Sequence, residues 1–377
     1  MGPAKAQNLV RRGGNSMKLN AADGMNYAPV GEKKAVVKPG EFIFSAARLD
    51  HGHIYGMCNA LTEAGATLKY VWDPDPEKVA HFLKVYPQAT PAQSEDQVLQ
   101  DPETKMVAAA AVTSERGPFG VKVMEHGKDY FTDKAPFTTM AQLNKAKETV
   151  AKTGKKYMVY YSERLHVEGA ILAGYLVDDG EIGKVISVSG FGPHRLGAGN
   201  RPAWFFEKEK YGGILCDIGS HQIEQYLHFA GEEDATVTLA RIGNFGHPDY
   251  PELDDYGDCA LTGAKGTANY FRVDWFTPDG LRTWGDGRTL ILGTEGFIEI
   301  RKYVNLASDK DGGNHVYLVN GKGEKYFDAT GMTGFPFFGG LILDCLNRTE
   351  KAMTQAHAFK AAELCLKAQE QAVVIAP

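Results

Sequence analysis

The most constraining feature of this sequence is a regular alternation of short apolar runs and helix-like segments between residues 42 and 163. Strand-like runs occupy 42–47, 67–72, 105–112, 129–135 and 156–163. Helix-like segments lie between them at 53–65, 75–86 and 139–154, and another ends at 121–127. Alternation of this kind predicts βαβ units, and therefore a parallel sheet with helices on both faces.

The pattern changes after about residue 183, where strand-like runs dominate. They occupy 184–192, 235–243, 258–276, 288–306 and 314–328, and Asn320-Gly321 is typical of a hairpin turn. Helices are predicted near 336–349 and 356–372. We expect an open, mostly antiparallel sheet with helices on one face. A length of 377 residues is too great for one ordinary core and suits two domains.

The predicted domains are residues 41–160 and 161–377, with the C-terminal helices packing back toward the first domain. Residues 1–40 lack apolar periodicity and are predicted to form a flexible arm, which could wrap a neighbouring subunit. They include Arg11-Arg12, but no apolar segment of an export signal follows. The five cysteines form no C-x-x-C pair, which favours reduced, buried thiols and a cytoplasmic location.

Two classes of partner are not expected. The net charge of −6 gives no sign of the basic face that nucleic-acid binding usually needs. The chain also has no run of 18 apolar residues, so no membrane span is predicted.

The loop after the first strand, "SAARLDHGHIYG", lies where a dinucleotide-binding domain carries G-x-G-x-x-G. If the motif begins at Ser45, its glycine positions hold Ser45, Ala47 and Asp50. Small residues at the first two still let the backbone approach a pyrophosphate. A carboxylate at Asp50 would compete with phosphate for the helix N-terminus, unless Gly52 takes that place in a longer loop.

Asp73 ends the second strand, 20 to 30 residues after this loop, where an acid would hold the adenosine ribose hydroxyls. No cation follows before Lys78, so a 2′-phosphate would meet a carboxylate. The pattern therefore favours NAD over NADP. The alternative is an Asp-Pro turn or a helix cap, which is common.

Two further segments carry candidate chemistry. Lys134, in "FTDKAPF", follows a parallel strand, and residues at such carboxyl ends face the ligand crevice. In "GGILCDIGSHQIEQ", Asp217 and His221 stand four residues apart. A solvated lysine, a helix-capping aspartate and a core histidine are the structural alternatives.

Taken together, these segments resemble the glucose–fructose oxidoreductase, inositol dehydrogenase and rhizopine-catabolism family of NAD(P)-dependent oxidoreductases over residues 41–377. The family has a Glu-Lys-Pro turn after its fifth strand. Here Asp133 replaces the glutamate, and Ala135 is inserted before the proline. Its Gly-Gly-x-Leu-x-Asp-x-Gly-x-His segment matches Gly212, Gly213, Leu215, Asp217, Gly219 and His221, and Glu224 replaces a final aspartate. The family also often has a histidine at the place of His53.

The resemblance implies a catalytic centre of Lys134, Asp217 and His221. A histidine with an unperturbed pKa near 6.5 suits removal of a hydroxyl proton. Asp217 would orient its ring, and Lys134 would stabilise negative charge on the oxygen. The expected cofactor-binding residues are Ser45, Ala47, Asp50, Gly52, His53, Ile54, Asp73, Thr113, Ser114, Asp133 and Lys134.

The expected substrate-binding residues lie in "YYSERLH" (160–166), in the glycine-rich loop 192–205 and in the catalytic segment. They are Tyr161, Arg164, His194, Arg201, Trp204, Asp217 and His221, with His166, Arg195 and Asn200 as further candidates. His51 and His53 could suggest a metal, but two histidines without a nearby acid triad do not predict one.

The sequence thus predicts an NAD-dependent dehydrogenase that oxidises a ring secondary hydroxyl of a sugar, sugar derivative or cyclitol. A homodimer or homotetramer through the free face of the open sheet is also expected. One alternative is an NAD-dependent enzyme that cleaves glycosides through transient oxidation. The other is a non-catalytic sensor of nucleotide or sugar.

Overall fold

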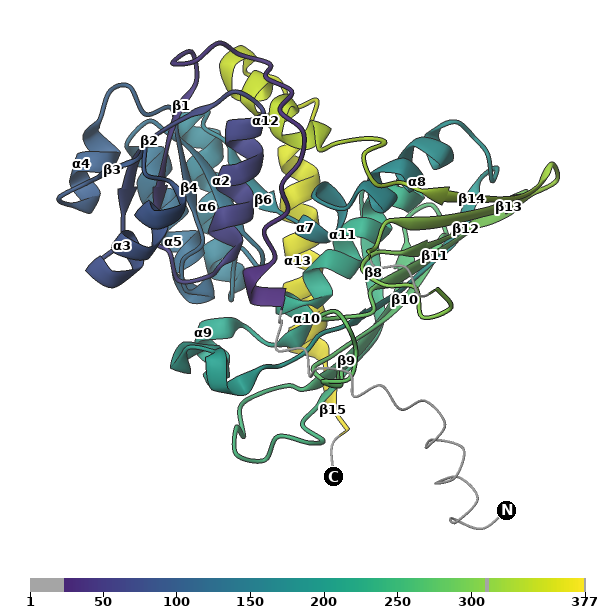
Figure 1. The fold of residues 1–377 in the computed structure, drawn as a ribbon. Coiled ribbons are helices and arrows are strands. Elements are labelled where there is room, and N and C mark those ends of the chain that lie inside the picture. The colour runs from purple at the N-terminus through teal and green to yellow at the C-terminus, as the bar shows by residue number, and fades with distance from the viewer. Residues whose placement is uncertain (1–23, 309–311, 376–377) are drawn as a thin grey trace.

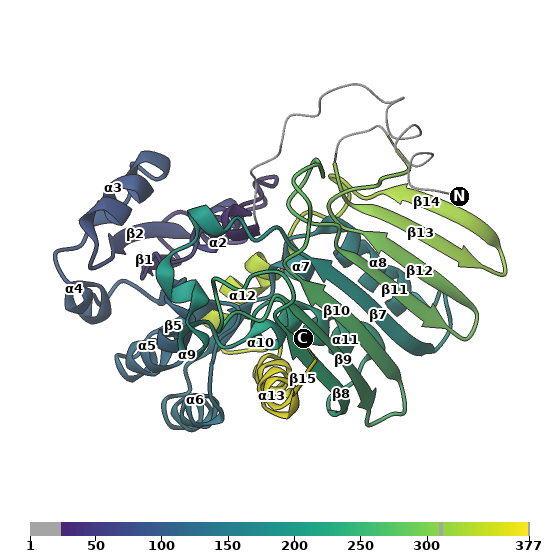
Figure 2. The ribbon, with the colours of Figure 1, turned by 90° about the horizontal axis from the view of Figure 1, so that it is seen from below.

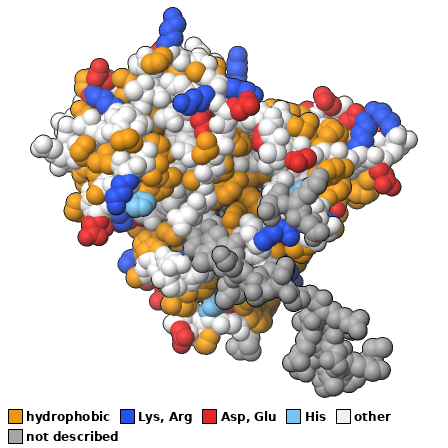
Figure 3. All heavy atoms as spheres, in the orientation of Figure 1, with side chains coloured by type: hydrophobic (Ala, Val, Ile, Leu, Met, Phe, Trp, Pro, Cys, Tyr) orange, Lys and Arg blue, Asp and Glu red, His pale blue; other side chains and the backbone are white. Residues whose placement is uncertain are grey.

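The computed structural model describes residues 24–308 and 312–375, so residues 1–23 of the expected arm lie outside it. Two sheets with their helices stand side by side (Figure 1). On the face drawn in Figure 3, acidic and basic side chains are interspersed and do not gather by sign. Among the described residues, no helix combines the length and apolar character that a membrane span requires.

The first sheet is parallel, as predicted, with the order β3-β2-β1-β4-β5-β6 in the described part of the chain. This is the doubly wound order: β2 and β3 lie on one side of β1, and β4, β5 and β6 lie on the other. The strand order therefore reverses between β1 and β4, which leaves a crevice at the carboxyl ends of these strands. The strands are β1 (Ile43–Ala47), β2 (Thr67–Trp72), β3 (Thr90–Pro91), β4 (Met106–Ala109), β5 (Asp129–Asp133) and β6 (Tyr157–Tyr160).

The helices of this domain begin and end where local signals place them. Asp75 caps the helix that starts at Pro76, and Gly154 ends another in the left-handed conformation. The helices are α2 (His53–Glu63), α3 (Pro76–Val85), α4 (Glu95–Gln100), α5 (Thr113–Glu125) and α6 (Met140–Thr153). The short elements β3 and α4 were not expected, because neither has enough residues to show a periodicity.

The second sheet has nine strands in the described residues, in the order β14-β13-β12-β11-β7-β10-β9-β8-β15. It is mostly antiparallel, as predicted, although β7 pairs in parallel with β10 and β8 with β15. The three long strand-like runs each fold into a hairpin. The strands are β7 (Val185–Pro193), β8 (Ala235–Gly243), β9 (Tyr256–Gly263), β10 (Ala268–Asp274), β11 (Arg288–Gly293), β12 (Gly296–Arg301), β13 (His315–Asn320), β14 (Gly323–Asp328) and β15 (Val373–Val374).

Helices cover one face of this sheet and leave the other open (Figure 2). α8, α10, α11 and α13 contact its strands, while α12 contacts α2 and α13 contacts α6 and β6 of the first domain. The helices are α7 (Ser162–Leu165), α8 (Glu168–Asp178), α9 (Lys208–Tyr211), α10 (Ile214–Asp217), α11 (Gly219–Ala230), α12 (Pro336–Asn347) and α13 (Gln355–Gln371). Three 3-10 turns are η1 (Gly24–Asn26), η2 (Ala198–Asn200) and η3 (Ala203–Phe206).

Residues 24–37, which we call the N-terminal strap, run along α2 (Figure 1). The Gly31 N–H donates to the Glu63 carboxylate at 3.0 Å, and the Val36 N–H donates to the Ala64 carbonyl at 2.9 Å. At the other end the Tyr27 hydroxyl donates to the His166 carbonyl at 3.0 Å. The expectation of a flexible arm over residues 1–40 is therefore wrong for this part, because tertiary hydrogen bonds that leave no periodicity in the sequence hold it.

We predict that Gly120→Ala destabilises the first domain. A Cβ at this α5 position would lie 2.4 Å from a ring carbon of Tyr157 and 2.5 Å from one of Tyr130. Overpacking of this kind costs about 1–3 kcal/mol. Urea denaturation would measure the loss. Gly280→Ala is the control, because its Cβ would meet nothing within 4 Å. Equal midpoints for the two variants would contradict the packing described here.

Candidate active site

The structure brings Lys134 and Asp217 together, although 83 residues separate them in the chain. Lys134 directly follows β5, and Asp217 is the last residue of α10. The lysine Nζ donates to Asp217 Oδ1 at 2.5 Å and to the Asp217 carbonyl at 3.3 Å. Both side chains are largely buried, at 5% and 14% exposure. Burial raises the pKa of Asp217, but the neighbouring Lys134 outweighs this effect and holds the pKa below its usual value, so the carboxylate is ionised.

Two buried side chains hold the backbone around Lys134. Asp133 Oδ1 accepts the Lys134 N–H at 2.8 Å. The Arg116 guanidinium, 1% exposed, donates to the carbonyls of Lys134 and Ala135, and its Nη2 lies 3.1 Å from Asp133 Oδ2. Hydrogen bonds thus hold both the N–H and the carbonyl group of Lys134. Arg116 belongs to no recognisable motif, so this role could not be predicted from the sequence.

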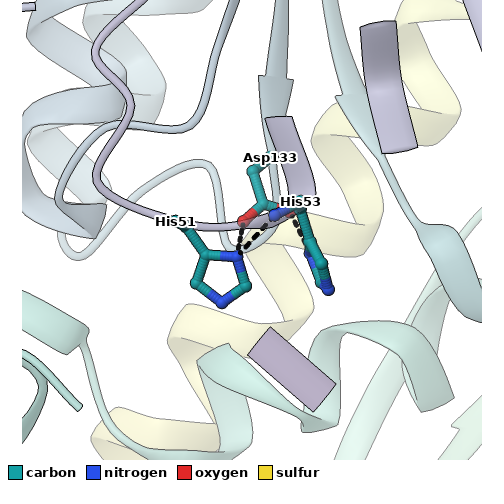
Figure 4. A group of neighbouring side chains, drawn as sticks. All are labelled: His51, His53 and Asp133. Carbon is teal, nitrogen blue, oxygen red and sulfur yellow. Dashed lines mark hydrogen bonds and ion pairs between the residues drawn. The ribbon is translucent and has the colours of Figure 1, made fainter. Parts of the chain in front are cut away.

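His51, His53 and Asp133 form a buried cluster whose ligand atoms all lie within 4.8 Å of one another (Figure 4). The sequence did not reveal Asp133 as the third member. Both of its oxygens face nitrogen atoms of the protein, because His53 Nδ1 lies 2.8 Å from Oδ1, and Arg116 Nη2 and His51 Nδ1 lie 3.1 Å and 3.3 Å from Oδ2. His51 Nδ1 accepts the His53 N–H at 3.2 Å. This geometry fits a hydrogen-bonded charge cluster better than a metal centre.

His221 lies in the first turn of α11, which begins at Gly219 as the spacing suggested. Asp217 does not orient its ring, since the Asp217 carboxylate is bonded to Lys134. Among the described residues, the buried His221 Nδ1 has no hydrogen-bond partner. Burial lowers the pKa of His221 to about 3, with Glu163 opposing this change and Lys134 adding to it. The expectation of an unperturbed histidine is therefore wrong, and the ring is neutral at pH 7.

Two charged residues near His221 were not predicted from the sequence as site residues. Glu163, in α7, forms a buried ion pair with Lys302, whose Nζ lies 2.8 Å from Glu163 Oε2. Glu163 follows the carboxyl end of β6, a position that could have drawn attention to it. Lys302 follows β12 far along the chain and offered no comparable signal.

The predicted cofactor side is arranged around the loop between β1 and α2. Asp73 accepts the Leu49 N–H of that loop at 2.6 Å. Asp50 is paired with Lys78, whose Nζ lies 2.5 Å from its carboxylate, so the expected competition with phosphate is reduced. The loop lies at the switch point of the sheet with an acid at the end of β2. These residues fit a dinucleotide.

The other predicted cofactor-binding residues differ in their contacts and positions. The Ser45 hydroxyl is bonded to Thr104 inside the sheet at 2.9 Å. Gly52 is closely approached by the strap, because a Cβ there would lie 2.4 Å from the Met25 carbonyl oxygen. The remaining ones line the same edge: Ala47 ends β1, Ile54 lies in the first turn of α2, and Thr113 and Ser114 begin α5.

The predicted substrate residues separate into two groups. His194 and Arg201 are buried, and the Arg201 charge helps to lower the pKa of Asp217. Arg164 instead forms an ion pair with Glu224, and the buried Tyr161 hydroxyl donates to the Ala358 carbonyl at 3.2 Å. Both are therefore held by other helices. Of the remaining candidates, His166 packs against Phe335, Trp204 lies in η3 and Asn200 lies in η2. The Arg195 guanidinium donates hydrogen bonds to the Pro278 and Leu281 carbonyls.

Two family models match this chain. Residues 53–161 match the oxidoreductase family with an NAD-binding Rossmann fold. Residues 172–299 match the GFO/IDH/MocA C-terminal domain. The two matches fall on the parallel-sheet domain and on the open-sheet domain.

Individual relatives agree with these matches. The scyllo-inositol 2-dehydrogenase (NAD(+)) of Bacillus subtilis is 30% identical over 298 residues, which cover 75% of this chain and 78% of that protein. The D-xylose dehydrogenase of Paenarthrobacter nicotinovorans is 33% identical over 134 residues, about a third of either chain (33% and 34%). A crystal structure of a protein described only as an oxidoreductase, from Erwinia carotovora atroseptica, has 48% identity and a TM-score of 0.86, covering 89% of this chain and 100% of that one. The chain therefore belongs to the GFO/IDH/MocA family of oxidoreductases, and its first domain is an NAD-binding Rossmann fold.

Proposed function

We propose that this oxidoreductase oxidises a ring secondary hydroxyl of a sugar, sugar derivative or cyclitol, with Lys134, Asp217 and His221 as its catalytic centre. The observation that carries the proposal is the buried Lys134–Asp217 pair at the carboxyl edge of the NAD-binding sheet. The relatives that act on inositol and xylose support the substrate class. NAD supplies the hydride acceptor when it is bound.

The residues of the chain then handle the proton and the charge. Lys134 has two of its three ammonium hydrogens on Asp217, which leaves one for the substrate oxygen. In our mechanism this donor stabilises negative charge on the oxygen as the carbon–hydrogen bond breaks. The neutral His221 accepts the hydroxyl proton. Asp217 fixes the lysine in place and balances its charge.

The buried, unpaired cysteines support a reducing compartment, and we propose the cytoplasm. For the assembly we propose a homodimer or homotetramer through the open face of the second sheet. Leu290, Leu292 and Phe297 are 37–42% exposed there. Apolar side chains clustered on an open sheet mark an interaction surface.

Lys134→Met and His221→Gln should each lower kcat/KM by roughly 100-fold to 10,000-fold, because each removes a proton-transfer or charge-stabilising group. The measurement follows absorbance of reduced cofactor with NAD and a panel of sugars and cyclitols. Lys322→Met is the control, since that side chain is 71% exposed. Turnover that survives in both site variants would refute the assigned roles.

The pH dependence of stability should reveal the neutral histidine. The pKa of His221 is about 3 in the folded protein and 6.5 ordinarily, so between these values the unfolded chain binds more protons. Stability therefore falls as pH decreases below 6.5. His221→Gln should remove about 1.4 kcal/mol per pH unit of that slope. Urea denaturation between about pH 7.5 and about pH 5 measures it, with exposed His126→Gln as control. An unchanged slope in His221→Gln would contradict the buried neutral state.

Leu290→Glu combined with Leu292→Glu should dissociate the assembly, because it places charges on the proposed interface. Sedimentation velocity would show a shift of the wild-type species to a monomer. A wild-type protein that is already monomeric at micromolar concentration would overturn the proposed interface.

A further inference from the structure

Glu163 occupies a position that the proposed mechanism leaves without a role. It lies three residues after β6, the strand that pairs with β5, and the register places Tyr160 opposite Asp133. The carboxyl ends of these two strands therefore lie side by side. Glu163 thus stands next to the strand end that carries Lys134. It is 1% exposed and forms an ion pair with Lys302.

The two oxygens of the Glu163 carboxylate differ in their hydrogen bonding. Oε2 accepts hydrogen bonds from Lys302 at 2.8 Å, Gln222 at 3.0 Å and Gln225 at 3.5 Å. Oε1 is buried and has no hydrogen-bond partner among the described residues. Burial alone would raise the pKa of Glu163, but its ion pair with Lys302 holds the pKa well below its usual value. Oε1 is therefore a charged acceptor without a donor, and buried polar atoms rarely remain so.

His194 does not supply that donor. Its Nε2 lies 3.9 Å from Glu163 Oε1. His194 Nδ1 lies 3.1 Å from the Gly192 carbonyl, so it carries the ring hydrogen. Burial lowers the pKa of His194 to about 4, so the ring is neutral at pH 7 and Nε2 is an acceptor. Two acceptors therefore face each other with no hydrogen between them.

Two acceptors 3.9 Å apart are satisfied by a group that donates two hydrogens. Two hydroxyl groups on adjacent carbons can each donate one hydrogen bond of about 2.8 Å, one to each acceptor. A carboxylate or phosphate on the ligand offers no hydrogen and would be repelled by Glu163. The Trp284 ring packs beside His194, with its centre 4.5 Å from that of the His194 ring. An aromatic face beside hydroxyl-binding groups is suited to an uncharged sugar or cyclitol ring.

The acceptor pair belongs to the same centre as the catalytic groups. Gln222, which holds Glu163, is the residue after His221. The charges of Lys134 and Asp217 act on the pKa of His194, and that of Glu163 acts on His221. A ring whose reacting hydroxyl lies at Lys134 and His221 would therefore extend its other hydroxyls toward Glu163.

We propose that Glu163 Oε1 and His194 Nε2 form a substrate subsite that binds a vicinal diol and discriminates against acidic sugars. Lys302 and Gln222 position the carboxylate and do not touch the substrate. This inference rests on the proposed oxidation of a sugar or cyclitol. It narrows that proposal to neutral polyhydroxylated rings.

The test compares Glu163→Gln with the wild type on D-glucose, D-xylose, myo-inositol and D-glucuronate, together with monodeoxy analogues of the best neutral substrate. Loss of a charged acceptor should raise KM for that substrate by about 10-fold to 100-fold, with kcat changed less than about threefold. The analogue without the bound hydroxyl should show a much smaller difference between the two proteins. The preference for glucose over glucuronate should shrink in the variant. A purely structural role for Glu163 would not produce this dependence on substrate hydroxyls.

Glu224→Gln is the matched control, because Glu224 is also buried but pairs with Arg164 and His357. It should lose stability and keep its KM. If the wild type oxidises a neutral substrate and Glu163→Gln keeps the same KM, the subsite is refuted and the proposed function stands. If the wild type neither oxidises nor is thermally stabilised by any member of the panel with NADH present, both proposals fail.

Discussion

The contact between Lys134 and Asp217 is the constraint on which the arrangement of this site depends. It joins the carboxyl edge of the parallel sheet to the short helix before α11, and so fixes how the second domain faces the first. Removing one partner would leave an uncompensated buried charge, which costs about 3–5 kcal/mol. Arg116 and Asp133 hold the lysine from behind through its own peptide unit. A lysine held in this way is pre-organised, and it need not reorder when charge develops on a substrate oxygen.

Neutral histidines surround this ionised pair. Burial keeps the pKa of His194 near 4 and that of His221 near 3, so each ring presents a lone pair at physiological pH. The charges in the centre are mostly compensated, Lys134 by Asp217 and Lys302 by Glu163. This balance favours an uncharged ligand with many hydroxyls. The strap borders the same region, because the Gly24 carbonyl lies 3.0 Å from His53 Nε2 and the Tyr27 ring packs on Trp284.

Much of the fold could be predicted because its signals are local. The helix cap at Asp75, the left-handed Gly154 and the apolar run of β4 are each set by neighbours in sequence. The motif around Asp217 and His221 located the candidate centre for the same reason. The roles of Arg164 and Tyr161 were harder to predict, because an arginine or tyrosine after a strand can face the crevice or a neighbouring helix. Here Arg164 pairs with Glu224 and Tyr161 bonds to α13. Neither contact can be predicted from the spacing of residues in the sequence.

The sequence by itself determined the parallel sheet of the first domain, the change to an antiparallel sheet and the residue types of the centre. These follow from periodicity, turn chemistry and a motif, all of which are encoded over a few residues. Only the tertiary structure decided that Asp217 pairs with Lys134 and not with His221, and that the strap lies along α2. It also decided that Lys302 meets Glu163 from 139 residues away. Such contacts depend on where separate elements pack, and burial then sets which protonation state each group can hold.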